Sequence, residues 1–231
     1  MQYGLLRSIW SISMFKAHEK SMTPIRSMRR PPRKNDPTGL RRKVLDAAYG
    51  MFQARGYNGT SMQELMEATA LSGGALHHHF PSKKSLVLAV FKERVAPAVR
   101  ETWIEPVRAA DSFGVGVQSV FEEIIAGLEG RGTVSGCPLN NLALELSLAD
   151  GEFRAAAAEI FYEWQEALGE CVRATRGGRG LTKSARAEVA AFIVSSYSGA
   201  MTLAKAEQNA KPLRSTAQNL KRWLQSNQLD K

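Results

Sequence analysis

Between residues 38 and 98 the hydrophobic positions recur at helical spacing, in segments separated by short turns. The first segment has an apolar face made of Val44, Leu45, Ala48 and Phe52. Residues three or four positions apart lie on one face of an α-helix, so this pattern predicts a helix over residues 39–55. Thr38 is a suitable N-cap for it, and Gly56 is a suitable C-terminal stop.

A second helix is predicted to begin after Thr60 or Ser61, because either can serve as its N-cap and Glu64 is placed to close a capping box. Its inward face consists of apolar residues at helical spacing: Met62, Leu65, Met66 and Ala70. Ser72 is a good N-cap for a third helix, which is predicted over about residues 73–79.

The third helix opens on Gly73, Gly74 and Ala75, so its first turn carries almost no side chains. Glycine costs a helix about 1 kcal/mol relative to alanine. A bare turn is useful where the backbone must come close to something else, and DNA is one candidate. Close packing against the second helix is the alternative explanation.

A fourth helix is predicted from Ser82, its cap, to about Arg100, after Pro81 has ended the third helix. Lys83 and Lys84 fall in its first turn, where the helix dipole disfavours positive charge. That placement indicates a phosphate group nearby.

The remaining chain continues the helical pattern but carries no motif of comparable strength. Further helices are predicted over about residues 112–128, 138–148, 150–176, 183–207 and 212–225. The predicted fold class is therefore all-α. Composition agrees with an ordinary globular chain, since 44% of its 231 residues are hydrophobic and 23% are charged. Two cysteines and the lack of a long uninterrupted apolar run predict a cytoplasmic protein without a membrane partner.

Charge is distributed unevenly along the chain. The net charge is +6 over residues 1–37, +4 over residues 38–98 and −1 over residues 99–231. A basic front end on a nearly neutral body suggests a polyanionic partner such as DNA. Residues 1–37 combine proline, glycine and charge, which predicts a disordered leader. Its basic residues either form an arm that contacts DNA or only improve solubility.

Two stretches carry a family resemblance. They are FQARGYNGTS (52–61) and ELMEATALSGGALHHHFPSKKSL (64–86). With the same spacing between them, they closely resemble the DNA-binding domain of the TetR family of bacterial transcription regulators. The commonest family form has tyrosines in the segment occupied here by His77, His78 and His79. The resemblance implies a DNA-binding domain over residues 38–98, with its helix-turn-helix at about 61–80.

The same resemblance implies which residues touch DNA. They are Thr60, Ser61, Ser72, Gly73, Gly74, Ala75, His77, His78 and Lys83. Thr60, Ser61 and Lys83 would hold phosphates, whereas the start of the third helix would face base edges or the adjacent backbone.

Residues 99–231 resemble the family's effector-binding and dimerisation domain more weakly, through GCPLNNLALELS (136–147) and SGAMTLAKAEQ (198–208). The resemblance implies a cavity for a small molecule and a dimer interface made by the last two long helices. The candidate cavity residues are Trp103, Phe113, Phe121, Tyr162, Trp164 and Met201. Aromatic residues at helical spacing can equally form plain core.

Other chemistry is not supported by the sequence. Three consecutive histidines on a helix point about 100° apart and cannot converge on one metal ion. No constellation typical of an enzyme stands out, and no cofactor is expected. Cys137 precedes Pro138 and is expected at a helix N-cap, where backbone N–H groups favour thiolate. It is either a redox or electrophile sensor or a small buried residue.

The expected function is that of a homodimeric repressor that binds double-stranded operator DNA and releases it when a small-molecule effector binds. The alternative is a helical small-molecule-binding or structural protein without specific DNA binding.

Overall fold

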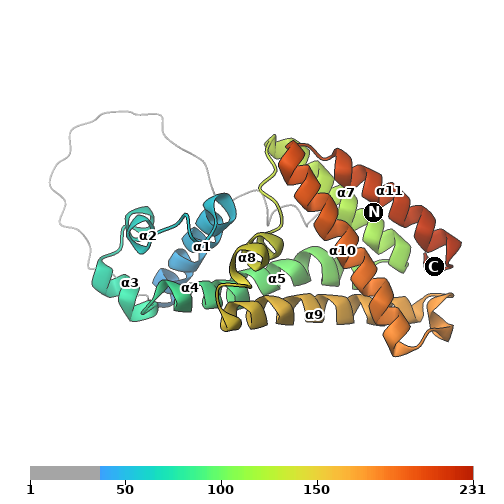
Figure 1. Cartoon of the computed structure of the whole chain (residues 1–231), viewed down its shortest axis with the longest axis horizontal. Coiled ribbons are helices and arrows are strands. Elements are labelled where there is room, and N and C mark those ends of the chain that lie inside the picture. The colour runs from blue at the N-terminus through green and yellow to red at the C-terminus, as the bar shows by residue number, and fades with distance from the viewer. Residues whose placement is uncertain (1–36, 231) are drawn as a thin grey trace, which may run out of the picture. The chain divides into compact units, whose positions relative to one another are not determined.

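The computed structural model describes residues 37–230, and these contain helices and no strand. The all-α prediction is therefore confirmed. The basic residues of the leader lie outside the described residues. Four helices open the described part (Figure 1): α1 (Pro37–Arg55), α2 (Met62–Thr69), α3 (Gly73–His79) and α4 (Lys83–Val90). The predicted first three helices agree with these bounds to within about two residues.

The fourth helix is longer than predicted, because it continues past Arg100 to Ala109. It consists of α4, the π-helical turn η1 (Phe91–Val95), α5 (Ala96–Val99), a second π-helical turn η2 (Arg100–Ile104) and α6 (Glu105–Ala109). Each π-turn stands just before a proline, and the amides of Ala96 and Glu105 bond five residues back instead of four. Proline lacks an N–H and crowds the carbonyl four residues earlier, so the wider turn lets the helix pass Pro97 and Pro106.

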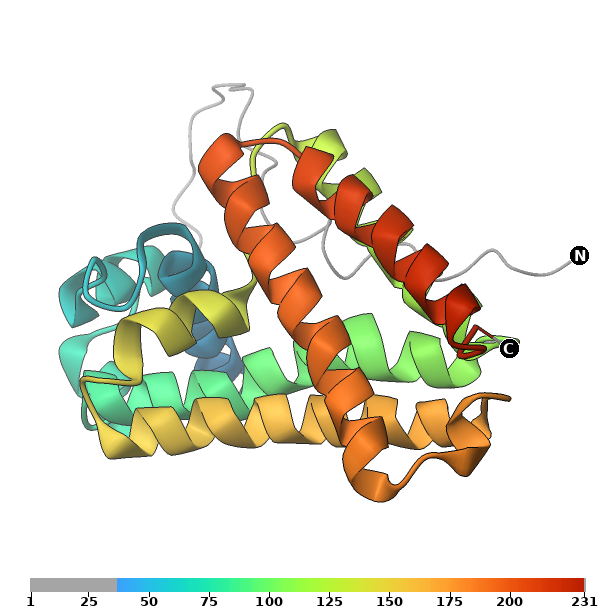
Figure 2. The same cartoon turned by 45° about the vertical axis from the view of Figure 1, so that its right-hand side comes forward.

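Five further helices complete the fold: α7 (Phe113–Arg131), α8 (Pro138–Leu146), α9 (Gly151–Ala174), α10 (Lys183–Glu207) and α11 (Lys211–Ser226). A 3₁₀ turn, η3 (Gly178–Gly180), joins α9 to α10. The helix α4–α6 runs alongside α9, and α7 runs alongside α11 (Figures 1 and 2). α10 contacts both α9 and α11. By length and apolar composition α10 could span a membrane, but its buried residues, among them Ile193 and Tyr197, pack in the protein core.

The small bundle of α1–α4 is held by an apolar core. Its buried side chains include Val44, Leu45, Ala48, Phe52, Leu65, Leu76, Phe80, Leu86 and Val87. They include the whole apolar face predicted for the first helix. Of the face predicted for the second helix, Leu65 is buried and Met62 and Met66 are partly buried, but Ala70 is exposed, so its predicted inward position is wrong. Burying each large aliphatic or aromatic side chain contributes about 1.5–3 kcal/mol. This core fixes the angle at which α3 leaves α2.

Candidate functional site

The α2–α3 unit is built by local hydrogen bonds. Ser61 and Glu64 form the predicted capping box: the Ser61 amide donates to Glu64 Oε2 at 2.7 Å, and the Glu64 amide donates to Ser61 Oγ at 3.1 Å. At the other end, Ala70 adopts a left-handed conformation with φ of 52°. This left-handed residue ends α2 and redirects the chain. Ser72 then caps α3, where its hydroxyl accepts a hydrogen bond from the Ala75 amide at 3.3 Å.

The capping bonds also lower the pKa of Glu64 to about 2, from an ordinary 4.5. The Ser61 amide is the largest cause, followed by the Ser61 hydroxyl and then Arg55, whose Nη1 lies 2.7 Å from Glu64 Oε1. Because the folded pKa is depressed, the carboxylate supports the folded α2 cap above about pH 4.5 and loses this effect as the pH falls toward 2.

α3 is anchored on one side and open on the other. Leu76 and the C-cap Phe80 are buried in the bundle core, whereas Ser72, Gly74, His77 and His78 are exposed. The two glycines differ. A Cβ added to Gly73 would lie 3.5 Å from Met66 Sδ on α2, whereas one added to Gly74 would meet nothing within 4 Å. The first distance is an ordinary van der Waals contact, so helix packing requires glycine at neither position, and the bare backbone of Gly74 faces open space.

Thr60 is a correction to the predicted DNA contacts. Its side chain is 1% exposed, and its hydroxyl donates to the Gly56 carbonyl at 3.0 Å. The residue shapes the turn between α1 and α2 and does not present its hydroxyl at the surface. Ser61, next in sequence, is exposed. Of the two threonine and serine positions predicted to hold phosphate, only Ser61 lies where it can reach one.

The two lysines after α3 have different surroundings. Lys83 is half-buried, with its Nζ 4.0 Å from the centroid of the Tyr57 ring, and burial lowers the pKa of its ammonium group. Lys84 Nζ lies 2.6 Å from Asp150 Oδ2 and 2.6 Å from Glu152 Oε1 at the start of α9. The charge of Lys84 is therefore satisfied within the fold, and no nearby phosphate is needed to explain its place in α4.

Glu145 on α8 is a functional candidate that the sequence pattern did not reveal. Its carboxylate accepts two backbone hydrogen bonds from the α1–α2 turn, from the Tyr57 amide at 2.8 Å and the Asn58 amide at 2.7 Å. A Cβ on Gly56, which has a φ of +77°, would approach Glu145 Oε2 to 2.7 Å. Glycine is thus needed for both the turn and the carboxylate. No local signal links residues almost 90 positions apart in the chain.

A cluster of four aromatic residues lies in the core of the C-terminal part. Trp103, Phe121, Trp164 and Tyr197, here called the aromatic cluster, are all buried. Trp103 is central, with ring centroids 5.6 Å from Phe121, 5.1 Å from Trp164 and 4.8 Å from Tyr197. Three of the six predicted cavity residues therefore meet, but their rings fill the space between them.

The other three predicted cavity residues lie outside the aromatic cluster. Tyr162 is 63% exposed on α9, so the prediction that it lines an internal cavity is wrong. Phe113 is buried at the start of α7 and Met201 is buried on α10. Tyr197 was missed because its helical position is typical of ordinary core.

Cys137 caps α8 as predicted, but its environment contradicts the sensor hypothesis. The side chain is 7% exposed, and burial raises the pKa of the thiol. The amides of Asn140 and Leu139 and the Tyr197 hydroxyl oppose that shift without overcoming it. A reactive thiol needs exposure and a depressed pKa, so Cys137 is a buried structural residue next to the aromatic cluster.

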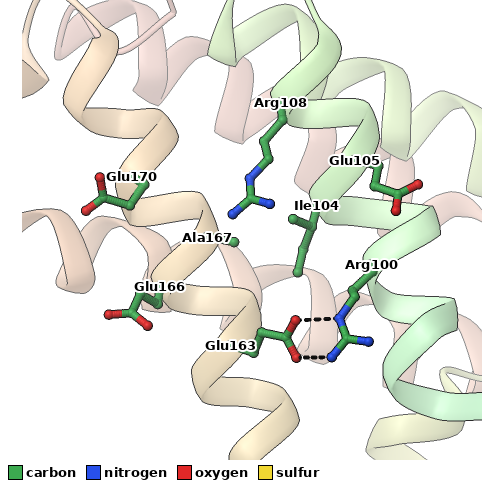
Figure 3. A pocket seen from close by; sticks show the side chains of 8 residues that line it. All are labelled: Arg100, Ile104, Glu105, Arg108, Glu163, Glu166, Ala167 and Glu170. Atoms are coloured by element: carbon green, nitrogen blue, oxygen red, sulfur yellow. Dashed lines mark hydrogen bonds and ion pairs between the residues drawn. The ribbon is translucent and has the colours of Figure 1, made fainter. Parts of the chain in front are cut away.

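A surface groove lies between the η2–α6 segment of the long helix and α9 (Figure 3), with a cavity volume of about 310 Å³. Its lining is mostly charged: Arg100, Ile104, Glu105, Arg108, Glu163, Glu166, Ala167 and Glu170. Arg100 and Glu163 form a two-point ion pair across it, with Nη2 2.7 Å from Oε2. None of the predicted cavity residues lines this groove.

Comparison with known proteins agrees with this geometry. Residues 44–90 match the family described as bacterial regulatory proteins, tetR family, and residues 115–219 match the LmrA/YxaF-like transcriptional regulator C-terminal domain. The HTH-type transcriptional regulator LmrA of Bacillus subtilis is 26% identical over 75% of this chain and 90% of its own length. The HTH-type transcriptional repressor DhaR of Mycobacterium sp. is 25% identical over 76% and 87%, respectively.

Solved structures share the fold. A TetR-family regulator from Cytophaga hutchinsonii superposes with a TM-score of 0.72 at 21% identity, over 84% of this chain and 98% of that one. The reduced form of Escherichia coli NemR gives a TM-score of 0.71 at 20% identity, over 80% and 96%. The matched families and relatives are transcription regulators and not enzymes, and the outward-facing α3 on a capped helix-turn-helix agrees with that class. The chain belongs to the TetR family of bacterial transcription regulators.

Proposed function

We propose that the protein is a cytoplasmic homodimeric repressor that binds operator DNA through α3 and releases it when a small molecule binds the C-terminal domain. The DNA-binding part of this proposal is supported by the open face of α3. Gly74, His77 and His78 are exposed there, while Leu76 and Phe80 anchor the helix in the core. Repression rather than activation is supported by the similarity to DhaR, which is named a transcriptional repressor.

The proposed contacts follow from exposure. Ser61 at the start of α2 and Lys83 at the start of α4 reach phosphates, while Ser72 to Ala75, His77 and His78 face the major groove. We also propose the division into a leader (1–37), a DNA-binding domain (38–98) and an effector-binding and dimerisation domain (99–231), with one qualification. Residue 98 lies inside α5, so the DNA-binding and effector domains share one unbroken helix.

That shared helix suggests how the two domains communicate. It begins at Lys83, three residues after the Phe80 cap of α3, and carries Trp103 into the aromatic cluster. Glu145 forms a second link, from α8 to the turn before α2. An effector that fits only one arrangement of the cluster would shift the population between DNA-competent and DNA-incompetent forms.

The dimer interface is proposed on α10 and α11. Exposed residues of α10 form a stripe at helical spacing: Phe192, Ser195, Gly199, Thr202 and Leu203. The Phe192 ring meets Trp223 of α11 with centroids 4.8 Å apart, which joins the two helices into one surface. Small residues in the middle of such a stripe allow the helices of two copies to approach closely.

Gly199→Glu is expected to make the protein monomeric. Nothing lies within 4 Å of a Cβ at this position, so the single chain tolerates the side chain, but two copies bring like charges together at the interface. Like-charge contacts cost several kcal/mol, so the dimer should weaken by roughly 100-fold or more. Sedimentation equilibrium measures this. Gly74→Glu is the matched control and should remain dimeric; an equally stable dimer for both variants would contradict the assignment of this face.

Lys83→Ala is expected to weaken binding to all DNA sequences similarly. Loss of one phosphate contact should reduce the slope of log K against log salt by about 0.9. Fluorescence anisotropy at several salt concentrations measures the slope. The matched control is Lys84→Ala, which breaks the ion pairs with Asp150 and Glu152 and should leave the slope unchanged. A change in sequence preference at constant slope would refute the phosphate contact.

A further inference from the structure

We infer that the effector is an uncharged ring compound bearing a hydrogen-bond-accepting oxygen, and that the aromatic cluster binds it through the indole N–H groups of Trp103 and Trp164. This rests on the proposed function only in taking the cluster as the effector site. The ligand class itself follows from which hydrogen-bonding groups and charges are buried there.

Two buried donors in the cluster lack partners. Among the described residues, the indole nitrogens of Trp103 and Trp164 are the buried side-chain polar atoms without a hydrogen-bond partner. The indole N–H of Trp103 is close enough to the Tyr197 hydroxyl to lower its pKa slightly against the effect of burial. The contact nevertheless falls outside hydrogen-bonding geometry, so Trp103 Nε1 has no partner. Buried tryptophan N–H groups usually find an acceptor, and leaving one unpaired is unfavourable. That both lie in one cluster of contacting rings indicates an acceptor that arrives with a ligand.

The absence of buried charge restricts the ligand further. In the described part of the chain the buried polar side chains are Thr60, Thr69, Asn140 and Thr175, none of which carries a charge. Besides burial, the groups that affect the pKa of the Tyr197 hydroxyl are Cys137, Trp103 and Tyr49, and none of them is an acid, lysine or arginine. An ionised carboxylate or ammonium group entering this core would therefore have no counter-charge and would lose its hydration.

Ring geometry favours a flat, apolar body. Trp103 meets Phe121 at 86° and Tyr197 at 68°, and Phe121 meets Tyr197 at 80°. These are edge-to-face contacts, which another ring can replace with little loss. Trp103 also lies on the π-turn η2, where the hydrogen-bond ladder of the helix is already shifted. A ligand would enter by separating Trp103 from its neighbouring rings. Because Trp103 belongs to the long helix that begins with α4, this separation would move that helix.

Four probes of similar shape test the ligand class on the full-length protein by calorimetry. They are 2-acetylnaphthalene (uncharged acceptor), 2-isopropylnaphthalene (no acceptor), 2-naphthoate (anion) and 2-naphthyltrimethylammonium (cation). We expect the ketone to bind about tenfold or more tightly than the hydrocarbon, and the two ions to bind least. Equal binding of ketone and hydrocarbon, strongest binding of either ion, or no binding of any probe would overturn the inference.

Indole N–H resonances locate the binding. Of the four tryptophans, Trp103 and Trp164 should show shifted side-chain N–H signals with the ketone but not with the hydrocarbon. Trp164→Phe keeps a ring but removes the donor, and should reduce the preference for the ketone over the hydrocarbon; Trp223→Phe on α11 is the control and should keep it. Operator binding is measured separately on the same samples. Ketone binding without any operator binding would leave the ligand class intact and remove the proposed regulatory role.

Discussion

Gly74→Glu should abolish specific operator binding while the protein stays folded and dimeric. The position is exposed in the first turn of α3, and an added side chain meets nothing within 4 Å. Replacing a helical glycine stabilises a helix by roughly 0.5–1 kcal/mol, and an acidic group near a helix N-terminus is favourable. On DNA, the same carboxylate would separate the backbone from the base edges and repel phosphates. We expect affinity to fall about 100-fold or more.

Anisotropy with an operator fragment measures the loss, and thermal unfolding reports the fold. Gly74→Ala is the matched control at the same site, since it adds only a methyl group; it should unfold at a similar or higher temperature and bind within a few-fold of the natural protein. If Gly74→Glu bound the operator as tightly as Gly74→Ala, α3 would not be the element that enters the groove.

Glu145→Ala should loosen the helix-turn-helix and weaken operator binding, while the packing of the aromatic cluster stays unchanged. The substitution leaves the amides of Tyr57 and Asn58 without their carboxylate acceptor, and those two bonds fix the turn that leads into α2. Loss of bonds to a charged group costs about 1.5–3 kcal/mol each, partly recovered by water at the exposed Asn58. We expect a net loss of about 2 kcal/mol in the free energy of unfolding.

Hydrogen exchange of the Tyr57 and Asn58 amides tests this directly, and both should exchange faster in Glu145→Ala. Glu145→Gln keeps one acceptor oxygen, so it should protect one of the two amides and show an intermediate operator affinity. Unchanged exchange at both amides in Glu145→Ala would mean that the turn holds its shape without α8, and the link between the two domains would then rest on the α4–α6 helix alone.

Local signals in the sequence were sufficient for the helix-turn-helix. The Ser61–Glu64 capping box and the Ser72 cap act within three residues, and the apolar face predicted for α1 lies in the bundle core. The site was less predictable wherever a partner came from far along the chain. Lys84 pairs with the start of α9, and Glu145 holds the α1–α2 turn, so neither role is visible in a local pattern.

The C-terminal part shows the same limit. Helical spacing identifies Trp103, Phe121 and Trp164 as inward-facing, but it cannot tell a filled aromatic core from a cavity, because this depends on how α9 and α10 meet. Tyr162 is apolar enough to be a cavity candidate, yet it lies on the exposed side of α9. The π-turns of the long helix were likewise missed, because a proline in a helical pattern ordinarily predicts a bend or an end.

The central claim is that a dimer of this chain reads a specific DNA sequence with two copies of α3. Hydroxyl-radical footprinting on the region upstream of its own gene tests this most directly, with the salt concentration varied. The account predicts two protected half-sites on one face of the duplex, separated by about one helical turn or a multiple of it, that weaken as salt rises and are lost in Gly74→Glu. Protection that is uniform along the fragment, or none at any salt concentration, would contradict it.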